Sequence, residues 1–212
     1  MPTALEEVFQ AIIDGEQKKV VSGIETALNN GLDPATILNE GMIKPMSEVG
    51  RRFEAGDYFI PEMLLSARAM QAGLGILRPR LVQSGVKARG KVVIGTARGD
   101  LHDIGKNLVA MMLEGAGYEI KDLGTDVPPE AFVNAIIAEK ADILALSALL
   151  TTTMQAMQQT VQAVQEAGVR ERMKIIIGGA PVTEAYARKI GADGFSPDAS
   201  RAVVLVNSLM GK

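Results

Sequence analysis

The sequence predicts two domains of different class, an all-α bundle of four helices followed by a doubly wound α/β domain with a parallel sheet of about five strands. The first observation is length, because 212 residues exceed the roughly 100–150 of a typical single domain. The second is a change of hydrophobic period near residue 85, from spacings of three and four residues to short β-branched runs. The third is the alternation of those runs with helical stretches, which is typical of α/β domains.

The first 85 residues predict the helical bundle. Their apolar residues recur at helical spacing, as in Leu5, Val8, Phe9, Ile12 and Ile13. Turn-forming sequences at 14–15, 29–34 and 55–57 divide the segment into four helices. Asp33 is expected to cap one of them, with Pro34 at the first helical position, where the missing N–H costs nothing. We therefore expect a bundle domain over 1–85.

The segment 78–90 predicts a domain boundary, because it mixes proline, glycine and basic residues. A second domain is expected over 90–212. Strands are predicted at 91–96, 118–123, 142–147 and 174–177, and helices at 104–115, 129–139, 153–167, 183–190 and about 197–209. Continuous apolar strands such as 143–146 are typical of a parallel sheet covered on both faces, which favours a flavodoxin-like, Rossmann-type arrangement.

Composition excludes several classes of site. Without cysteine the chain can form no disulfide, thiolate zinc site or cysteine-ligated iron–sulfur cluster, and a single histidine excludes an all-histidine metal cage. A net charge of −3 gives no basic footprint for nucleic acid. No apolar run approaches the roughly 18 residues of a membrane span, and the first residues are acidic where a secretory signal is basic. We expect a cytoplasmic protein without nucleic-acid or membrane partners.

The one histidine, His102, lies in the glycine-flanked loop after the first predicted strand, two residues beyond Asp100. A carboxylate there can accept a hydrogen bond from one imidazole nitrogen and leave the other free to bind a metal. A histidine that caps a helix or lies on the surface is an alternative that position alone leaves open. A phosphate-binding loop is excluded, because Asp100 stands where its first glycine is needed and Asn107 follows Lys106. The glycine motif for dinucleotides and the serine elbow of hydrolases are also absent.

Two further motifs follow later strands, where ligands of doubly wound sheets bind. The three motifs in chain order are Asp100-x-His102-x-x-Gly105, Ser147-x-Leu149 and Gly178-Gly179. Together they resemble the signature of the cobalamin-binding domain shared by methionine synthase, corrinoid methyltransferase proteins and some mutases. A serine-to-threonine departure occurs at Thr153, where methionine synthase has a serine.

The resemblance implies a corrinoid cofactor, cobalamin or methylcobalamin in the base-off, His-on form, with His102 as the lower axial ligand of cobalt. Asp100 would be the hydrogen-bond partner of His102, and Thr153 would complete a proton relay. The loop around the histidine is implied to contact the cofactor through Gly99, Leu101, Asp103, Ile104 and Gly105. A slot for the nucleotide tail would be opened by Ser147, Leu149, Thr151, Gly178, Gly179, Ala180 and Pro181. Glycine suits such a slot because a side chain would block a flat ring.

Residues 52–70 resemble the capping helical bundle of methionine synthase and of the corrinoid proteins of anaerobic methyltransferase systems. In that family the bundle covers the upper face of the corrin. Phe59, Met63 and Met70 are candidates to shield that face, because they share one side of the helix or its approach. Packing within the bundle is an equal alternative for each of them.

The function that the resemblance implies is that of a corrinoid methyl carrier, one subunit of a multi-component methyltransferase rather than a complete enzyme. Such a protein accepts a methyl group on cobalt from a substrate-specific methyltransferase and passes it to a second methyltransferase, with tetrahydrofolate or a thiol as acceptor. A reductive activase is a third expected partner. Methanol, a methylamine, a methoxylated aromatic and a quaternary amine are all possible donors. A cobalamin-dependent sensor, the small subunit of a mutase and a nucleotide-binding domain without corrinoid are the rival interpretations.

Overall fold

The computed structural model describes residues 3–85 and 87–211. They separate into two compact units, Met1–Ala88 with Glu114–Gly117 and Arg89–Leu113 with Tyr118–Lys212. Val86, in the expected linker, lies outside the described residues together with Met1, Pro2 and Lys212. Within the ranges that the structure describes, no helix is both long enough and apolar enough to span a bilayer.

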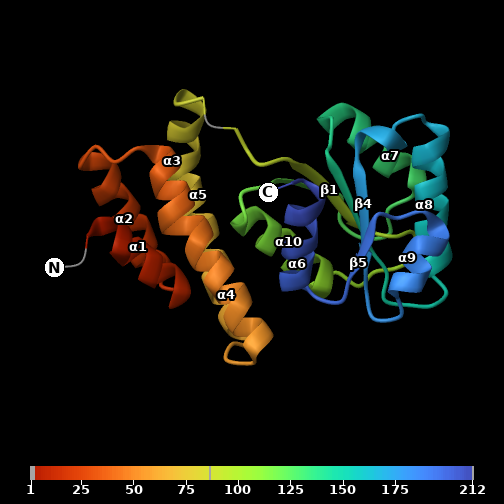
Figure 1. The fold of residues 1–212 in the computed structure, drawn as a ribbon, viewed down its shortest axis with the longest axis horizontal. Coiled ribbons are helices and arrows are strands. Elements are labelled where there is room, and N and C mark those ends of the chain that lie inside the picture. The colour runs from red at the N-terminus through yellow and green to blue at the C-terminus, as the bar shows by residue number, and fades with distance from the viewer. Residues whose placement is uncertain (1–2, 86, 212) are drawn as a thin grey trace. The chain divides into compact units, whose positions relative to one another are not determined.

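The first unit is entirely helical (Figure 1). Its elements are α1 (Ala4–Ile13), α2 (Gln17–Asn29), α3 (Pro34–Thr36), the π-helix η1 (Ile37–Ile43), α4 (Lys44–Ala55) and α5 (Ile60–Gln83). Because α3, η1 and α4 follow one another without a break, four helical rods form, and the predicted bundle is confirmed. Aliphatic and methionine side chains such as Ile12, Ile24, Met42 and Val49 are fully or almost fully buried between the rods.

Local sequence explains where the helices begin. Thr3 and Glu6 form a reciprocal capping box ahead of α1, with each side chain accepting a hydrogen bond from the backbone N–H of the other. Asp33 accepts a hydrogen bond from the Thr36 N–H at 3.1 Å, with Pro34 as the first helical residue. The predicted cap is therefore confirmed.

The π-helical turn before α4 was not predicted. The Lys44 N–H donates to the Asn39 carbonyl, five residues back instead of four. Pro45 follows, and it has no N–H to donate and its ring would collide with the carbonyl four residues earlier in a regular helix. The wider turn accommodates this proline without ending the helix.

Helix α5 runs into the segment that was predicted as the domain boundary. The segment from residue 78 was expected to be a linker, but the helix continues through Pro79 to Gln83. A proline inside a helix removes one backbone hydrogen bond without necessarily stopping the turns that follow. The first residues of the predicted boundary segment, as far as Gln83, are therefore helical.

The second unit is a five-stranded parallel sheet in the order β2-β1-β3-β4-β5. The strands are β1 (Lys91–Thr96), β2 (Glu119–Asp122), β3 (Ile143–Ser147), β4 (Lys174–Gly178) and β5 (Gly194–Ser196). The helices are α6 (Ile104–Gly115), α7 (Pro129–Glu139), α8 (Met154–Glu166), the short 3-10 helix η2 (Arg170–Arg172), α9 (Glu184–Ile190) and α10 (Ala199–Leu209). The predicted fold class is confirmed, and the fifth strand is the one the sequence did not locate.

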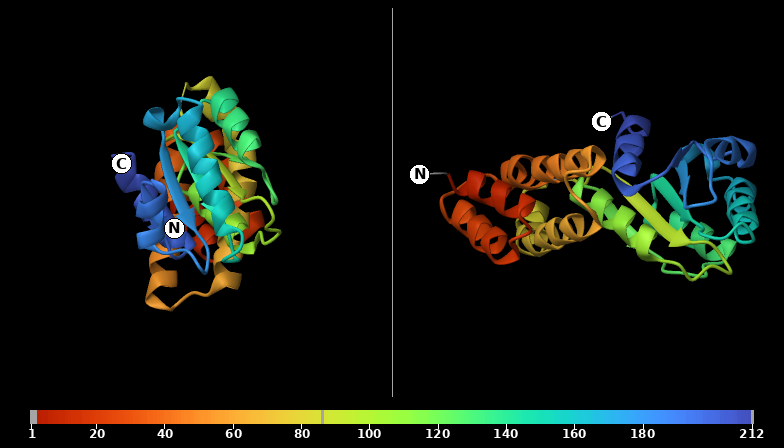
Figure 2. Two further views of the ribbon diagram at one scale, coloured as in Figure 1. Left: turned by 90° about the vertical axis from the view of Figure 1, so that its right-hand side faces the viewer. Right: turned by 90° about the horizontal axis from the view of Figure 1, so that it is seen from below.

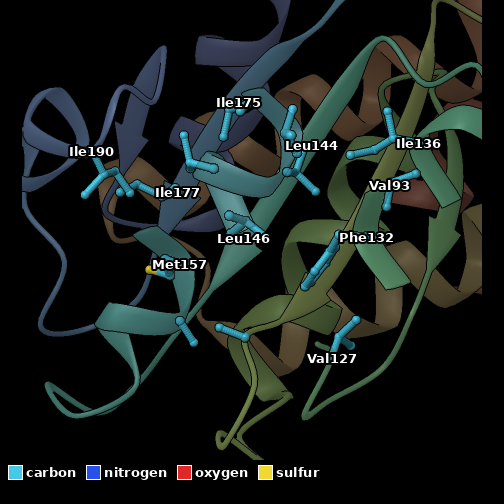
Figure 3. Packing of buried hydrophobic residues seen from close by; sticks show 14 of the residues in the cluster. Val93, Val127, Phe132, Ile136, Leu144, Leu146, Met157, Ile175, Ile177 and Ile190 are labelled. Atoms are coloured by element: carbon cyan, nitrogen blue, oxygen red, sulfur yellow. The ribbon is translucent and has the colours of Figure 1, made fainter. Parts of the chain in front are cut away.

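Helices cover both faces of the sheet, with α6 and α10 on one side and α7, α8 and α9 on the other (Figures 1 and 2). Alternate residues of the inner strands point to the face that α7, α8 and α9 cover. Figure 3 shows one core cluster there, which includes Val93, Leu144, Leu146, Ile175 and Ile177 of the strands with Phe132, Ile136, Met157 and Ile190 of the helices. Burial on both faces explains why these strands are apolar throughout.

Candidate functional site

The three motifs meet at one edge of the sheet because the strands that carry them end in register. Thr96 at the end of β1 pairs with Ser147 of β3, and Ser147 pairs with Gly178 of β4. The loops that follow these residues therefore start side by side. A doubly wound sheet binds its ligands at this carboxyl edge.

Asp100 is the polar centre of the site, and its side chain is fully buried. One carboxylate oxygen accepts hydrogen bonds from His102, from the backbone N–H at 3.0 Å and from Nδ1 at 2.7 Å. The other accepts from the Thr153 hydroxyl at 2.7 Å and from the backbone N–H groups of Leu149 and Leu150 at 2.7 and 3.3 Å. A single carboxylate thus joins the loop after β1 to the loop after β3.

The surroundings of Asp100 keep it ionised. Burial raises the pKa of a carboxyl group, because a charge is poorly solvated there. The hydrogen bonds from the Thr153 hydroxyl, from the His102 and Leu149 N–H groups and from the imidazole outweigh burial, so the pKa of Asp100 lies well below its ordinary value. As an anion the side chain is only an acceptor, and His102 must therefore donate from Nδ1.

His102 presents its second ring nitrogen to the surroundings. With the proton on Nδ1, Nε2 carries a free lone pair, and 52% of the side chain is exposed. Within residues 3–85 and 87–211, nothing is hydrogen-bonded to Nε2. The Thr96 hydroxyl holds the main chain of the residue by donating to the His102 carbonyl at 2.9 Å. This geometry suits a histidine that binds a metal, with a carboxylate behind it.

Exposed apolar side chains lie on the loops after β1 and β3 and at the start of α6. Leu101 and Ile104 are 73% and 76% exposed, and Leu149 and Leu150 are each 42% exposed. A Cβ added to Gly105 would meet nothing within 4 Å, so that glycine leaves open space at the start of α6. Exposed apolar side chains on the loops that hold a nitrogen with a free lone pair suit a large, flat and largely apolar ligand.

The glycine pair at the end of β4 is required by contacts within the chain. Gly179 has a φ of +126°, and a Cβ there would lie 1.9 Å from the Ala148 carbonyl oxygen. A Cβ at Gly178 would lie 3.1 Å from the Ser196 carbonyl oxygen. The close approach of the backbone just after β3 thus explains Gly179 without a ligand, and the part of Gly179 in a tail slot stays a prediction.

The other predicted loop residues line the same edge. Ser147, Gly178 and Pro181 are half-buried, whereas Gly99, Thr151 and Ala180 are exposed. Asp103 is exposed, and its carboxylate accepts a hydrogen bond from the Asn107 side chain at 3.0 Å, which stabilises the first turn of α6. Leu150 and Thr96 were not predicted as site residues. The available signal for Thr96 was a hydroxyl residue at the last position of a predicted apolar strand, shortly before a motif. In the structure Thr96 is buried.

In the helical unit the three candidates differ in exposure. Phe59 is 65% exposed, but Met63 and Met70 are 0% and 1% exposed. Only Phe59 presents its side chain to an added ligand without rearrangement of α5. Shielding by any of the three remains a prediction.

Comparison with protein families identifies both parts of the chain. A model described as a B12 binding domain matches residues 90–204, which include all three motifs, and a second model with that description matches residues 4–78. A corrinoid protein of Desulfitobacterium hafniense (strain Y51) is 40% identical over 211 residues, covering 98% of each chain. This chain belongs to the corrinoid protein family.

Further corrinoid proteins agree with that assignment. Dimethylamine corrinoid protein 2 of Methanosarcina acetivorans is 41% identical over 207 residues, which cover 97% of this chain and 95% of that protein. A chain of the methanol:cobalamin methyltransferase complex of Methanosarcina barkeri matches with a TM-score of 0.88 and 31% identity, over 98% of this chain and 80% of that one. As a corrinoid protein of this type, the chain combines a helical domain with a Rossmann-like domain, as the sequence predicted.

Proposed function

We propose that this corrinoid protein carries a methyl group between two methyltransferases, with His102 as the lower ligand of the cobalt. The observation that carries the proposal is the buried Asp100 carboxylate, which holds Nδ1 of His102 and leaves Nε2 exposed. Two of the proteins named above support a methyl-carrying role, because one is a dimethylamine corrinoid protein and the other belongs to a methanol:cobalamin methyltransferase complex.

The residues present fit such a group. His102 would hold the metal through Nε2 in place of the cofactor's own base, and Leu101, Ile104, Leu149 and Leu150 would contact the apolar part of the macrocycle. Open space at Gly105 leaves room for close approach. Ser147, Thr151, Gly178, Gly179, Ala180 and Pro181 would line the slot for the displaced nucleotide tail. When bound, the cofactor supplies a redox-active metal centre able to accept and release a methyl group.

The chain's own contribution is to hold the imidazole and to accommodate a proton. The single Thr153 hydroxyl hydrogen has two acceptors within reach, the Asp100 carboxylate at 2.7 Å and the Leu150 carbonyl at 2.9 Å. While Asp100 is ionised, the hydroxyl donates to it. If Asp100 takes up a proton, the hydroxyl can turn to Leu150 and accept from the acid instead. Thr153 can therefore hydrogen-bond to Asp100 whether Asp100 is ionised or protonated. This would link the ligand position of His102 to proton uptake.

We further propose that the helical unit shields the cofactor through Phe59, with Met63 and Met70 as secondary candidates. The partners would be a substrate-specific methyltransferase, a second methyltransferase that uses tetrahydrofolate or a thiol, and a reductive activase. A methylated amine is the first donor to test, because dimethylamine corrinoid proteins are among the relatives of about 40% identity. The cofactor would be in the base-off, His-on form.

Loading the purified chain with cobalamin tests the ligand assignment. The wild type should show a His-on visible spectrum, whereas His102→Ala should show the base-off spectrum and bind more weakly, because the metal loses its only protein ligand. Asp142→Ala provides a control far from the site. An unchanged spectrum in His102→Ala would refute the assignment. Methyl transfer to the loaded wild type should then be assayed against methyltransferases for amines, methanol and methoxylated aromatics, and transfer with none of them would refute the carrier role.

A further inference from the structure

Asp126, in the loop between β2 and α7, forms two hydrogen bonds with the turn that leads to His102. Its carboxylate oxygen Oδ1 accepts a hydrogen bond from the Gly99 N–H at 2.7 Å. Its own N–H donates to the Asp100 carbonyl at 2.9 Å. These two bonds enclose the Gly99–Asp100 dipeptide, so one residue fixes the main chain of Asp100 from both sides.

The backbone of Asp126 has an uncommon conformation. Its φ is +54°. Among the described residues, the only other non-glycine residue at positive φ is Lys140, which ends α7. Aspartate and asparagine tolerate this region better than most residues. Asp126 adopts this conformation while its N–H and its carboxylate both form hydrogen bonds to the same turn. The positive φ therefore accompanies the hydrogen bonds that hold Gly99 and Asp100.

The loop that carries Asp126 is itself anchored to β1. The Thr96 N–H donates to the Gly124 carbonyl at 2.9 Å, and the Val127 N–H donates to the Thr96 carbonyl at 3.0 Å. The buried Thr96 hydroxyl in turn holds the His102 carbonyl. The loop that carries Asp126 is therefore held in place against β1.

An ion pair between a buried lysine and a partly exposed aspartate anchors the other end of the same loop. The Lys106 side chain is 1% exposed, and its ammonium contacts the Asp122 carboxylate. The second oxygen of Asp122 accepts a hydrogen bond from the Gly124 N–H at 2.8 Å. Since Lys106 lies in the first turn of α6, the helix that follows His102 and the loop that carries Asp126 are tied together.

We propose that Asp126 is a positioning residue for His102. By fixing the main chain of Asp100, it sets where the Asp100 carboxylate stands and so directs Nε2 of the imidazole toward the metal. This inference rests on the proposed function.

The test compares Asp126→Ala with Asp126→Asn in the full chain. Alanine removes the acceptor for the Gly99 N–H, and we expect the equilibrium between the His-on and base-off forms to shift about tenfold toward base-off, as for the loss of one charge-assisted hydrogen bond. Asparagine keeps an amide oxygen and tolerates positive φ, so it should restore most of the His-on form. Visible spectra of the cobalamin-loaded proteins measure the equilibrium.

A second readout needs no cofactor. The chain has one histidine, so the ring ¹⁵N chemical shifts report on His102 without assignment. The wild type should hold its proton on Nδ1, whereas Asp126→Ala should show a mixture of tautomers. Asp142→Ala is the matched control, because Asp142 forms the same pair of bonds at the opposite edge, accepting from the Lys91 N–H at 2.8 Å and donating to the Lys91 carbonyl at 2.9 Å.

The outcomes separate the two proposals. Wild-type tautomer and wild-type His-on fraction in Asp126→Ala would overturn the positioning role, as would equal effects of Asp126→Ala and Asp142→Ala. A wild type that shows no His-on spectrum would instead overturn the proposed function, and the ring shifts would still test whether Asp126 orients His102.

Discussion

Asp100 uses every favourable direction around its carboxylate, with two donors on one oxygen and three on the other. Asparagine in its place would turn an NH₂ group toward donors on one side or the other. A buried donor left facing another donor costs about 1–3 kcal/mol. The carboxylate is therefore needed for the shape of the two loops as well as for the imidazole.

Gly179 gives a prediction at the residue scale. Gly179→Ala should lower the free energy of unfolding by roughly 3 kcal/mol, because the new Cβ would lie 1.9 Å from the Ala148 carbonyl oxygen at a φ of +126°. Gly168→Ala is the matched control, since Gly168 has a φ of +69° but nothing within 4 Å, and it should lose about 1 kcal/mol. Urea unfolding of the cofactor-free proteins measures both, and equal losses would contradict the packing explanation.

Single residues also show what the sequence could and could not predict about the site. The spacing of Asp100 and His102 was enough to expect the contact found at 2.7 Å, and family resemblance placed Thr153 beside Asp100. Asp126 was not predicted, because its importance depends on a positive φ and on a loop 26 residues further along the chain. Met63 was a candidate for a ligand surface with packing in the bundle as an equal alternative, and it is buried. Helical spacing alone cannot distinguish a face toward a ligand from a face toward the core.

At the scale of elements, α4 offers a pH-dependent stabilisation. Hydrogen bonds from Arg51 first, and then from Arg52, lower the pKa of Glu48 from 4.5 to about 2. Because the folded state has the lower pKa, the unfolded chain binds more protons between these values. The contribution of Glu48 to the stability of the fold is complete above the pKa that Glu48 has in the unfolded chain, and it is lost as the pH falls toward 2.

Urea midpoints of the wild type and Glu48→Gln should therefore differ most at neutral pH and converge on acidification. The effect should be modest, since these side chains keep between 26% and 63% of their surface exposed, where water screens the charges. Circular dichroism from pH 7 to pH 3 measures the midpoints. Additional replacement of Arg51 and Arg52 by alanine should remove the pH dependence, and a difference that grows at low pH would show that the sign is wrong.

Most elements followed from sequence, and the exceptions have physical causes. Strands β1, β3 and β4 are continuous apolar runs, which few other structures accommodate. Strand β5 has only three residues, too few for a periodic pattern. The π-helical turn before Pro45 was not predicted, because a proline predicts a kink or a stop in a helix and does not say how the chain will absorb it.

At the scale of the whole molecule, the two units should have separable roles. Every hydrogen bond to the Asp100 carboxylate comes from residues 102–153, so a chain of residues 89–212 should keep the His-on spectrum. When both are loaded with methylcobalamin, the shortened chain should lose its methyl group in light faster than the full chain, because it lacks the proposed shield. Absorbance during illumination measures the rates. Equal rates, with the His-on spectrum retained, would exclude a shielding role for the helical unit.

The row formed by Thr96, Ser147 and Gly178 limits how such proteins can be re-engineered. Grafting one of the three loops from a relative should succeed only if the donor and recipient strands are equally long, because one inserted residue turns every later side chain of a strand to the opposite face. Chimeras should therefore be joined at the amino ends of β1, β3 and β4. Each strand would then be exchanged together with the loop that it carries.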